Sequence, residues 1–267
     1  QVRKLGAGTM RISSVNAFPC LQVSAGKVIV NHLNALGADT TSRNAGFTGI
    51  ANLVTVDGGT LDLNGFSNSI GGLSGGGVAT GVILNNAVSA STLTLGSSGA
   101  STAFGGVIQD GTSAVAITKT GAGTLTLTNA NTYTGTTTIE NGSVVLSGGN
   151  NRLSGSGAVT LGASGTSGKL VLGDGTAVSN QTLTGLSTAG SGGSVVGGNA
   201  SNSVLTLNLS GNVTFGGTLG GAGTNENNLS LTKSGAGTLT LSGSSTFTGK
   251  TTLSAGTLLI GNANALG

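Results

Sequence analysis

Short runs in which apolar and polar residues alternate recur along almost the whole chain. Two of them read Leu-Thr-Leu, at residues 125–127 and 239–241, and a related run, Ser-Thr-Leu-Thr-Leu, occupies residues 91–95. An apolar period of two places alternate side chains on opposite faces of a strand, whereas an amphipathic helix needs a period of about 3.6. Glycine and asparagine, which are typical of turns, stand between most of the runs. The pattern therefore predicts short β-strands joined by tight turns.

In the first half of the chain the expected strands follow one another at short intervals. They are residues 8–13, 27–31, 53–56, 60–63, 82–84, 92–95 and 107–108. The irregular residues 38–50 are predicted to form a projecting loop. Gly-Ala-Gly at residues 121–123 and Asn-Gly at residues 141–142 are predicted corners, because tight corners need the positive φ that glycine adopts without steric cost.

A segment of about 34 residues occurs three times. Residues 119–153 return almost intact at 233–266, and a more divergent copy occupies residues 4–36. The lysines that open the copies, Lys4, Lys119 and Lys233, are 115 and 114 residues apart. A fixed period is typical of an array in which each unit buries its apolar face against its neighbours.

The passages between these copies also correspond. Residues 59–63, 91–95 and 104–106 parallel residues 168–172, 203–207 and 215–217. We therefore predict one elongated array over residues 1–267, with super-repeats at approximately 4–118 and 119–232 and a partial third at 233–267. Two glycine-rich segments, residues 71–77 and 190–198, lie at similar positions in it. They are predicted to be surface turns of the array instead of flexible linkers.

The two good copies resemble the autotransporter-associated β-strand repeat, also called the passenger-associated transport repeat. The matching stretches are residues 125–127, 131–139 and 141–146 in one copy and 239–241, 246–253 and 255–260 in the other. The first copy departs from the pattern, with Phe-Pro-Cys at residues 18–20 where Tyr-Thr-Gly stands at 133–135. The resemblance implies an extracellular β-helix without a family active site, followed by an outer-membrane barrel outside these residues.

A parallel β-solenoid is preferred over a β-sandwich, which could use the same alternation. Aromatic residues make up only 3% of the chain, and a narrow coil interior is filled by stacked Leu, Ile, Val and Ala. The expected fold is all-β, a right-handed parallel β-helix built from repeats of about 114 residues. Coils of roughly 20 residues stacked at about 4.8 Å would give a rod of about 60 Å. Threonine and asparagine are expected to form side-chain ladders along it.

The composition and the charge distribution argue against several classes of function. Ten basic and seven acidic residues are scattered without a basic patch, which argues against nucleic-acid binding. The first ten residues lack a signal peptide, and no apolar run is long enough for a membrane span. Without a signal or barrel, the sequence is expected to be part of a longer protein.

The search for catalytic chemistry gives weak candidates. Asp57 and Asp62 are the best carboxylate pair, which adjacent coils could bring together for polysaccharide cleavage, although turn and surface roles are simpler. His32, the single histidine, and Cys20, the single cysteine, have no metal-binding partners in the sequence. Residues 162–170 and the segment around Lys250 depart from the phosphate-binding loop pattern. We therefore predict no catalytic residue, no cofactor and no metal.

The function expected from these features is a non-catalytic scaffold or stem of a bacterial autotransporter-like surface protein, located at the cell surface or outside the cell. Folding of coil on coil would help to draw the chain outward. Two alternatives stay open. One is a self-assembling extracellular fibre or adhesin that associates head to tail, and the less favoured one is a polysaccharide-active enzyme on the same scaffold.

Overall fold

The computed structural model describes residues 1–16, 19–37, 50–77 and 81–267. Its described residues form β-strands and turns and include no α-helix. The predicted projecting loop, residues 38–50, lies outside the described residues except for Ile50. By contacts the chain divides into two compact units, residues 1–135 and 136–267.

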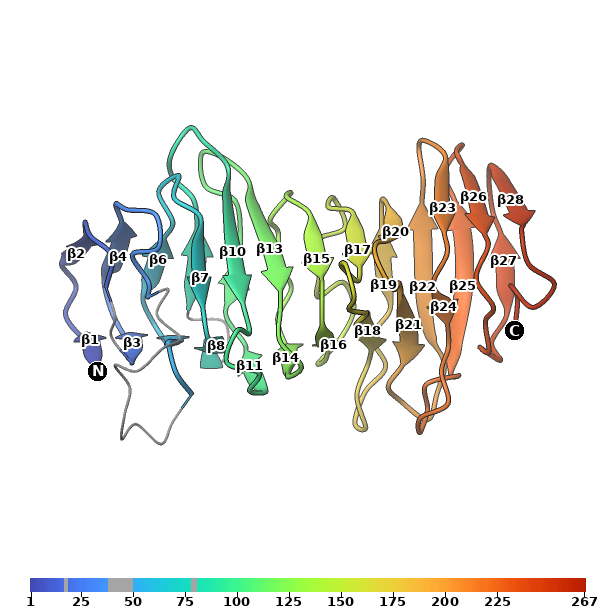
Figure 1. Ribbon diagram of the computed structural model, residues 1–267, viewed down its shortest axis with the longest axis horizontal. Coiled ribbons are helices and arrows are strands. Elements are labelled where there is room, and N and C mark those ends of the chain that lie inside the picture. The colour runs from blue at the N-terminus through green and yellow to red at the C-terminus, as the bar shows by residue number, and fades with distance from the viewer. Residues whose placement is uncertain (17–18, 38–49, 78–80) are drawn as a thin grey trace. The chain divides into compact units, whose positions relative to one another are not determined.

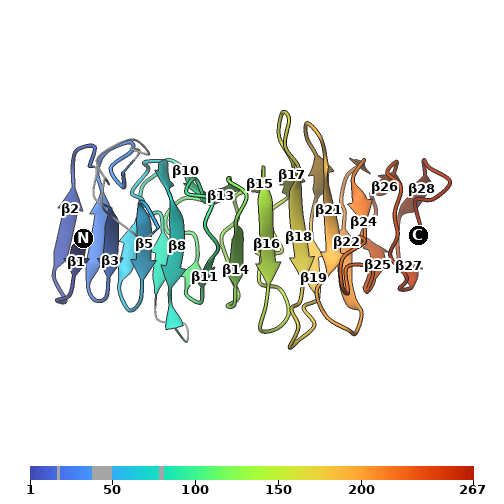
Figure 2. The same cartoon turned by 60° about the horizontal axis from the view of Figure 1, so that its bottom comes forward.

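Three parallel sheets make up the first unit (Figures 1 and 2). The first sheet has the order β1 (Val2–Lys4), β3 (Cys20–Val23), β5 (Leu53–Val56), β8 (Gly72–Gly75), β11 (Thr102–Phe104) and β14 (Thr124–Leu127). The second contains β2 (Thr9–Ile12), β4 (Lys27–Val30), β6 (Thr60–Asp62), β9 (Val82–Leu84) and β12 (Val107–Ile108). The third contains β7 (Asn68–Ile70), β10 (Ser91–Leu95) and β13 (Val115–Lys119).

The second unit is built in the same way. One sheet contains β16 (Gly142–Leu146), β18 (Gly168–Leu172), β21 (Gly193–Gly197) and β24 (Thr218–Leu219). Another contains β15 (Thr137–Ile139), β17 (Val159–Leu161) and β20 (Leu186–Thr188). The remaining two contain β19 (Gln181–Leu183), β22 (Ser203–Asn208), β25 (Leu229–Ser234) and β27 (Thr251–Leu253), and β23 (Val213–Phe215), β26 (Thr238–Leu241) and β28 (Thr257–Ile260).

Consecutive strands visit the sheets in turn, which makes each unit a stack of coils. In the first unit, β8, β9 and β10 belong to the first, second and third sheets, and β11 returns to the first sheet beside β8. Every strand pair with a defined register among the described residues is parallel, for example β5 with β8 and β18 with β21. The expected all-β parallel β-helix is therefore confirmed, while the repeat length of about 114 residues stays a prediction.

The core is a set of apolar rows that run from coil to coil. Leu21, Val54 and Leu73 occupy equivalent positions of β3, β5 and β8, and each is at most 1% exposed. The polar neighbours of these residues in the strands point outward, as the alternation predicts. A fully buried Leu or Val contributes about 1.5–3 kcal/mol, so the summed rows replace a globular core.

Coil length varies more along the chain than the sequence predicted. Val2 pairs with Leu21, and Leu21 pairs in turn with Val54, so the second of these two coils is much longer than the first. In the second unit Val144 pairs with Leu170 and Leu170 with Val195, which makes two coils of nearly equal length. Only the strands must stay in register between coils, because the connecting turns lie at the surface and tolerate insertions.

The glycine-rich segments were wrongly predicted to be surface turns. Residues 72–75 form β8 and residues 193–197 form β21, and Leu73 and Val195 inside them are buried. A Cβ on Gly193 would lie 2.3 Å from the carbonyl oxygen of Gly168 in the adjacent coil. Glycine is used there because the backbones of neighbouring coils approach too closely for any side chain. The expected corners at Gly121 and Gly142 do adopt positive φ, 66° and 68°.

Polar ladders of the predicted kind occur on the outer surface. The Thr55 and Ser74 hydroxyls of adjacent coils are 2.8 Å apart, and Asn64 donates to the Asn31 side chain at 2.9 Å. Hydrogen bonds between coils thus replace ion pairs on this weakly charged surface.

The copies of the repeated segment do not lie on the same face. In the first unit Lys4 ends β1 in the first sheet, whereas Lys119 ends β13 in the third sheet. In the second unit β15 and β16 pair with β17 and β18, whereas the equivalent β27 and β28 belong to the two other sheets. The spacing between copies is therefore not a whole number of coils, and successive copies begin on different faces of the coil.

Candidate functional site

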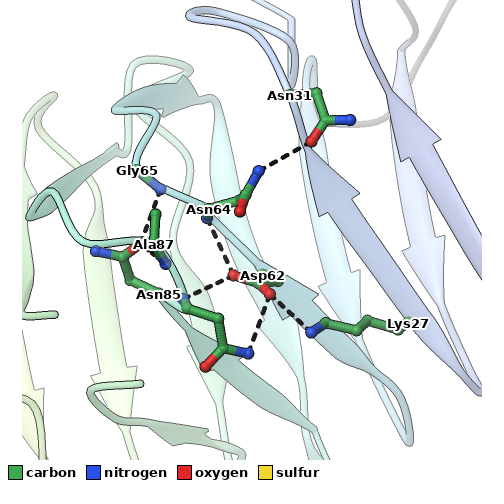
Figure 3. Close-up of polar contacts among 8 residues, drawn as sticks. Lys27, Asn31, Asp62, Asn64, Gly65, Asn85 and Ala87 are labelled. Atoms are coloured by element: carbon green, nitrogen blue, oxygen red, sulfur yellow. Dashed lines mark hydrogen bonds and ion pairs between the residues drawn. The ribbon is translucent and has the colours of Figure 1, made fainter. Parts of the chain in front are cut away.

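Of the two candidate aspartates from the sequence, Asp62 has more hydrogen-bonding and ionic partners than Asp57 (Figure 3). Its side chain is 2% exposed at the end of β6 and forms an ion pair with Lys27 of β4 at 2.7 Å. The backbone amides of Asn64 and Asn86 donate to one carboxylate oxygen at 3.0 Å each. The Asn86 side-chain amide donates to the other at 3.1 Å. These contacts tie Asp62 to the preceding and following coils.

The pKa of Asp62 has opposing contributions. Burial raises it, but the hydrogen bond from Lys27 and the amides of Asn86 and Asn64 lower it by more, so the pKa lies below its ordinary value. Asp62 therefore stays ionised near neutral pH. A general acid would need a raised pKa instead.

Asp57 lies in the turn that connects β5 with β6 on the same coil as Asp62. Its carboxylate accepts a hydrogen bond from the Gln22 side chain of the preceding coil at 2.9 Å. Gln22 in turn accepts one from Arg3 at 3.0 Å, which makes a polar row along the outer face of the first sheet. The two aspartates are thus bonded to different neighbours, Gln22 and Lys27. The expectation that adjacent coils bring them together is wrong, because they belong to one coil.

A polar groove of about 440 Å³ is present in the second unit. Its lining includes Gly142, Gly168 and Gly193, which pair in register across β16, β18 and β21. Lys169 lines it and forms an ion pair with Glu226. Burial raises the pKa of Glu226, but the hydrogen bonds from Lys169 and from the Gly223 amide lower it by more. The charges of Lys169 and Glu226 are therefore paired with each other within the protein.

Asp174 organises the turn after β18. The hydroxyls of Ser147 and Thr176 donate to its carboxylate, as do the amides of Thr176 and Ala177 at 2.8 and 2.9 Å. These donors hold the pKa of Asp174 well below its usual range. The carboxylate serves as a turn cap, as Asp-Gly at residues 174–175 predicts.

The remaining candidates do not form a site. His32 is exposed, and Cys20 is a free, half-buried thiol at the start of β3. Within the described ranges no three His, Cys, Asp or Glu side chains group in a way that could hold a metal ion. Lys169 lies in β18 and not in a loop, and Lys250 is exposed, as expected for an ordinary surface residue.

Asn131 continues a strand ladder through its side chain, a role that the sequence did not predict. Its Oδ1 accepts a hydrogen bond from the amide of Ile108 in the preceding coil at 2.7 Å, and the Thr132 amide donates to the Ile108 carbonyl at 2.9 Å. In the later copy Ser245 Oγ accepts in the same way from the Leu219 amide at 3.2 Å. The sequence signal that could have predicted this role is a polar residue two positions before an aromatic residue. The aromatic residues are Tyr133 and Phe247, and both are buried.

Two of the three lysines that open the copies are buried, and Lys4 is half-buried. Lys119 is 1% exposed and Lys233 is 0% exposed, and both direct Nζ to carbonyl oxygens of the turn that follows. Burial lowers the pKa of Lys119 to about 8. Sequence reasoning used these lysines only as markers of the repeat. Their fixed place before Gly-Ala-Gly was the signal for a structural role.

Comparison with known families identifies the repeated segment. Residues 117–146 and 231–260 match the family model described as the passenger-associated transport repeat, which confirms the resemblance. No curated protein and no solved structure matches the chain. The described residues also contain no apolar helix of the length needed to cross a bilayer.

Proposed function

Because the chain carries two passenger-associated transport repeats, which indicate an autotransporter passenger region, we propose that it is a non-catalytic β-helical stem that aids secretion and display at the cell surface. The observation that carries this proposal is the stack of parallel coils in each unit, with apolar rows inside and polar ladders outside. The single array over residues 1–267, with super-repeats near 4–118, 119–232 and 233–267, belongs to the same proposal.

The geometry suggests how such a stem would aid secretion. Each strand offers a row of free amides and carbonyls to the next parallel strand, so a folded coil is a template for the following one. Folding outside the membrane would then release free energy with every coil and oppose backward movement of the chain.

Surface exposure of the full natural protein in its bacterial host tests this role. Leu239 and Leu241 point into the coil in the second transport repeat and are 0% and 2% exposed. The variant Leu239→Ser with Leu241→Ser should reduce the protein accessible to external protease several-fold, because stacking loses two buried side chains. Thr240→Ser, on the outer side of the same strand, is the matched control. Normal display of the double variant would contradict the proposal.

Head-to-tail self-assembly into a fibre is kept as a second proposal, because the outer strands of any coil stack are templates for a further parallel strand. Electron microscopy with intact mass measurement of the natural protein checks it. Filaments with an axial repeat would support assembly, and single particles at high concentration would exclude it.

The enzyme alternative has less support, because Asp57 and Asp62 are each bonded to other residues. We expect Asp57→Asn and Asp62→Asn to leave any polysaccharide turnover by the protein unchanged. Turnover that is present in the natural protein and lost in both variants would restore the enzyme hypothesis.

A further inference from the structure

The buried lysine of a transport repeat contacts two consecutive coils. Lys233 Nζ donates to the carbonyls of Ser234 and Gly235 in its own turn at 2.7 and 2.8 Å, and to Ala255 in the next coil at 3.3 Å. An ammonium group has three donors, so these carbonyls satisfy it without a carboxylate.

The divergent first copy, in the other unit, repeats this arrangement. Lys4 Nζ donates to the Gly6 carbonyl in its own turn and to the Ala25 carbonyl of the next coil at 3.2 Å. The segment that it contacts reads Ser-Ala-Gly at residues 24–26, and the segment beside Lys233 reads Ser-Ala-Gly at residues 254–256. The same side-chain contact thus occurs in two copies that belong to different units.

The lysine backbone binds the same tripeptide. The Ser254 amide donates to the Lys233 carbonyl at 2.8 Å, and the Ser24 amide donates to the Lys4 carbonyl at 2.9 Å. Each lysine therefore accepts from the serine with its main chain and donates to the alanine with its side chain. We call this pair of contacts the lysine clamp, formed by Lys4 with residues 24–26 and by Lys233 with residues 254–256.

Glycine is required at the end of the tripeptide. Gly26 and Gly256 have φ of 68° and 72°, values that residues with a side chain rarely adopt. A Cβ on Gly256 would lie 2.8 Å from Lys233 Nζ, and one on Gly26 would lie 2.6 Å from Lys4 Nζ. The clamp therefore requires both the lysine of one coil and the positive-φ glycine of the next.

We propose that at Lys4 and Lys233 the lysine clamp sets the register in which the next coil joins the stack. Covering the lysine removes water from its ammonium group, which is costly unless a carbonyl replaces that water. The in-register coil supplies the alanine carbonyl. A slip by one residue would withdraw it and turn the apolar side chains outward. The role of the clamp in secretion rests on the proposed function, whereas its role in register does not.

Hydrogen exchange of the purified protein tests the clamp. Lys233→Met keeps the length of the side chain and removes its donors, and Lys250→Met, at an exposed lysine of the same repeat, is the matched control. We expect the amides of Ser254 and of β28 to exchange about tenfold faster in Lys233→Met, which corresponds to the loss of about one hydrogen bond to a charged group. Exchange in β22 should be unchanged, and Lys250→Met should match the natural protein.

The proposal would be overturned if the amides of residues 254–260 in Lys233→Met were as protected from exchange as in the natural protein. It would also be overturned if protection fell equally throughout the second unit. If Lys233→Met does not fold, Lys4→Met decides the matter through the amides of residues 24–30 in the other unit. Register is measured here without secretion. If Lys233→Met exchanges faster but is displayed normally at the surface, the clamp sets the register and has no role in secretion. Failed display of the Leu239 and Leu241 variant bears only on the proposed stem function.

Discussion

At the residue scale, the buried charges Asp62 and Lys233 each have a defined set of polar partners. Asp62 is bound by Lys27 and by amides of the following coil, and Lys233 is bound by three carbonyls. Burying a charge is favourable only when its hydrogen-bonding capacity is filled. These residues therefore fix the position of one coil against the next and are unsuited to reacting with a substrate.

Asp62→Asn should lower the free energy of unfolding by about 1–3 kcal/mol at pH 7, since Lys27 loses its partner but can still reach water. The folded pKa of Asp62 is depressed. Its stabilisation is therefore present above the unfolded pKa near 3.8 and is lost as the pH falls through the folded value. Urea unfolding at pH 7 and pH 3 should show a smaller acid loss in the variant. A double-mutant cycle with Lys27→Met gives the coupling energy, and an unchanged acid loss would contradict this account.

Lys119 should make the protein more stable at alkaline pH. Its folded pKa of about 8 lies below the unfolded value of 10.5, so the unfolded chain binds more protons between these values. The free energy of unfolding should therefore rise between pH 8 and 10.5, by up to about 3 kcal/mol. Urea titrations at pH 7.5, 9 and 10.5 measure the rise. Lys119→Met should remove this part of the pH dependence, whereas Lys250→Met should retain it.

At the element scale, strands are short, and their ends are shaped by close packing between coils. The aromatic ring of Phe104 lies against Gly106, where a Cβ would be 2.4 Å from the ring carbon Cζ. Phe215 and Gly217 repeat this arrangement with a distance of 2.6 Å. A buried ring thus fits a narrow coil only where the residue two positions later has no side chain.

Gly106→Ala should destabilise the protein by about 1–3 kcal/mol, because the added methyl group must displace both the Phe104 ring and the carbonyl oxygen of Gly81, which would lie 2.3 Å away. Gly8→Ala is the control, since a Cβ there meets nothing within 4 Å, and it should stay within about 0.5 kcal/mol of the natural protein. Chemical denaturation of both variants measures the difference. Equal stabilities would show that the ring and the Gly81 carbonyl move without cost.

Asn131→Ala should cost about 1–3 kcal/mol, because the buried Ile108 amide loses its acceptor. Asn131→Ser should recover part of that loss, as Ser245 performs the equivalent role in the other copy. Thr128→Ala, at an exposed position of the same repeat, serves as the control. If the serine variant is no more stable than the alanine variant, the hydrogen bond is not the cause.

At the scale of the whole molecule, charge contributes little to stability. Only 6% of the residues are charged, and the ion pairs that the structure describes include Lys27 with Asp62 and Lys169 with Glu226. Stability comes instead from apolar rows and from hydrogen bonds between coils, which salt screens weakly.

The free energy of unfolding should therefore change by less than about 0.5 kcal/mol between low and moderate sodium chloride at pH 7. Urea unfolding at the two salt concentrations checks this expectation, and Asp62→Asn should respond even less than the natural protein. A large loss of stability in salt would indicate long-range electrostatics that the sparse charges do not predict.

The sequence by itself determined the fold class, most strand positions and the repeated segment. These depend on local signals: an apolar period of two, glycine at corners, and near-identical residues at a fixed spacing. The expected strands at residues 53–56, 82–84 and 107–108 coincide with β5, β9 and β12. Asp-Gly at residues 174–175 is a turn dipeptide, and the hydrogen bonds of Asp174 agree with that role.

The tertiary structure alone decided what depends on the neighbouring coil. It made strands of glycine-rich residues 72–75, placed Asp57 and Asp62 on one coil with different partners, and buried Lys233 among carbonyls. It also placed successive copies of the repeat on different faces. The physical reason is that the number of residues per coil varies. Leu21, for example, pairs with Val2 on one side and with Val54 on the other. Which residues meet is therefore set by the register of stacking and not by any local pattern.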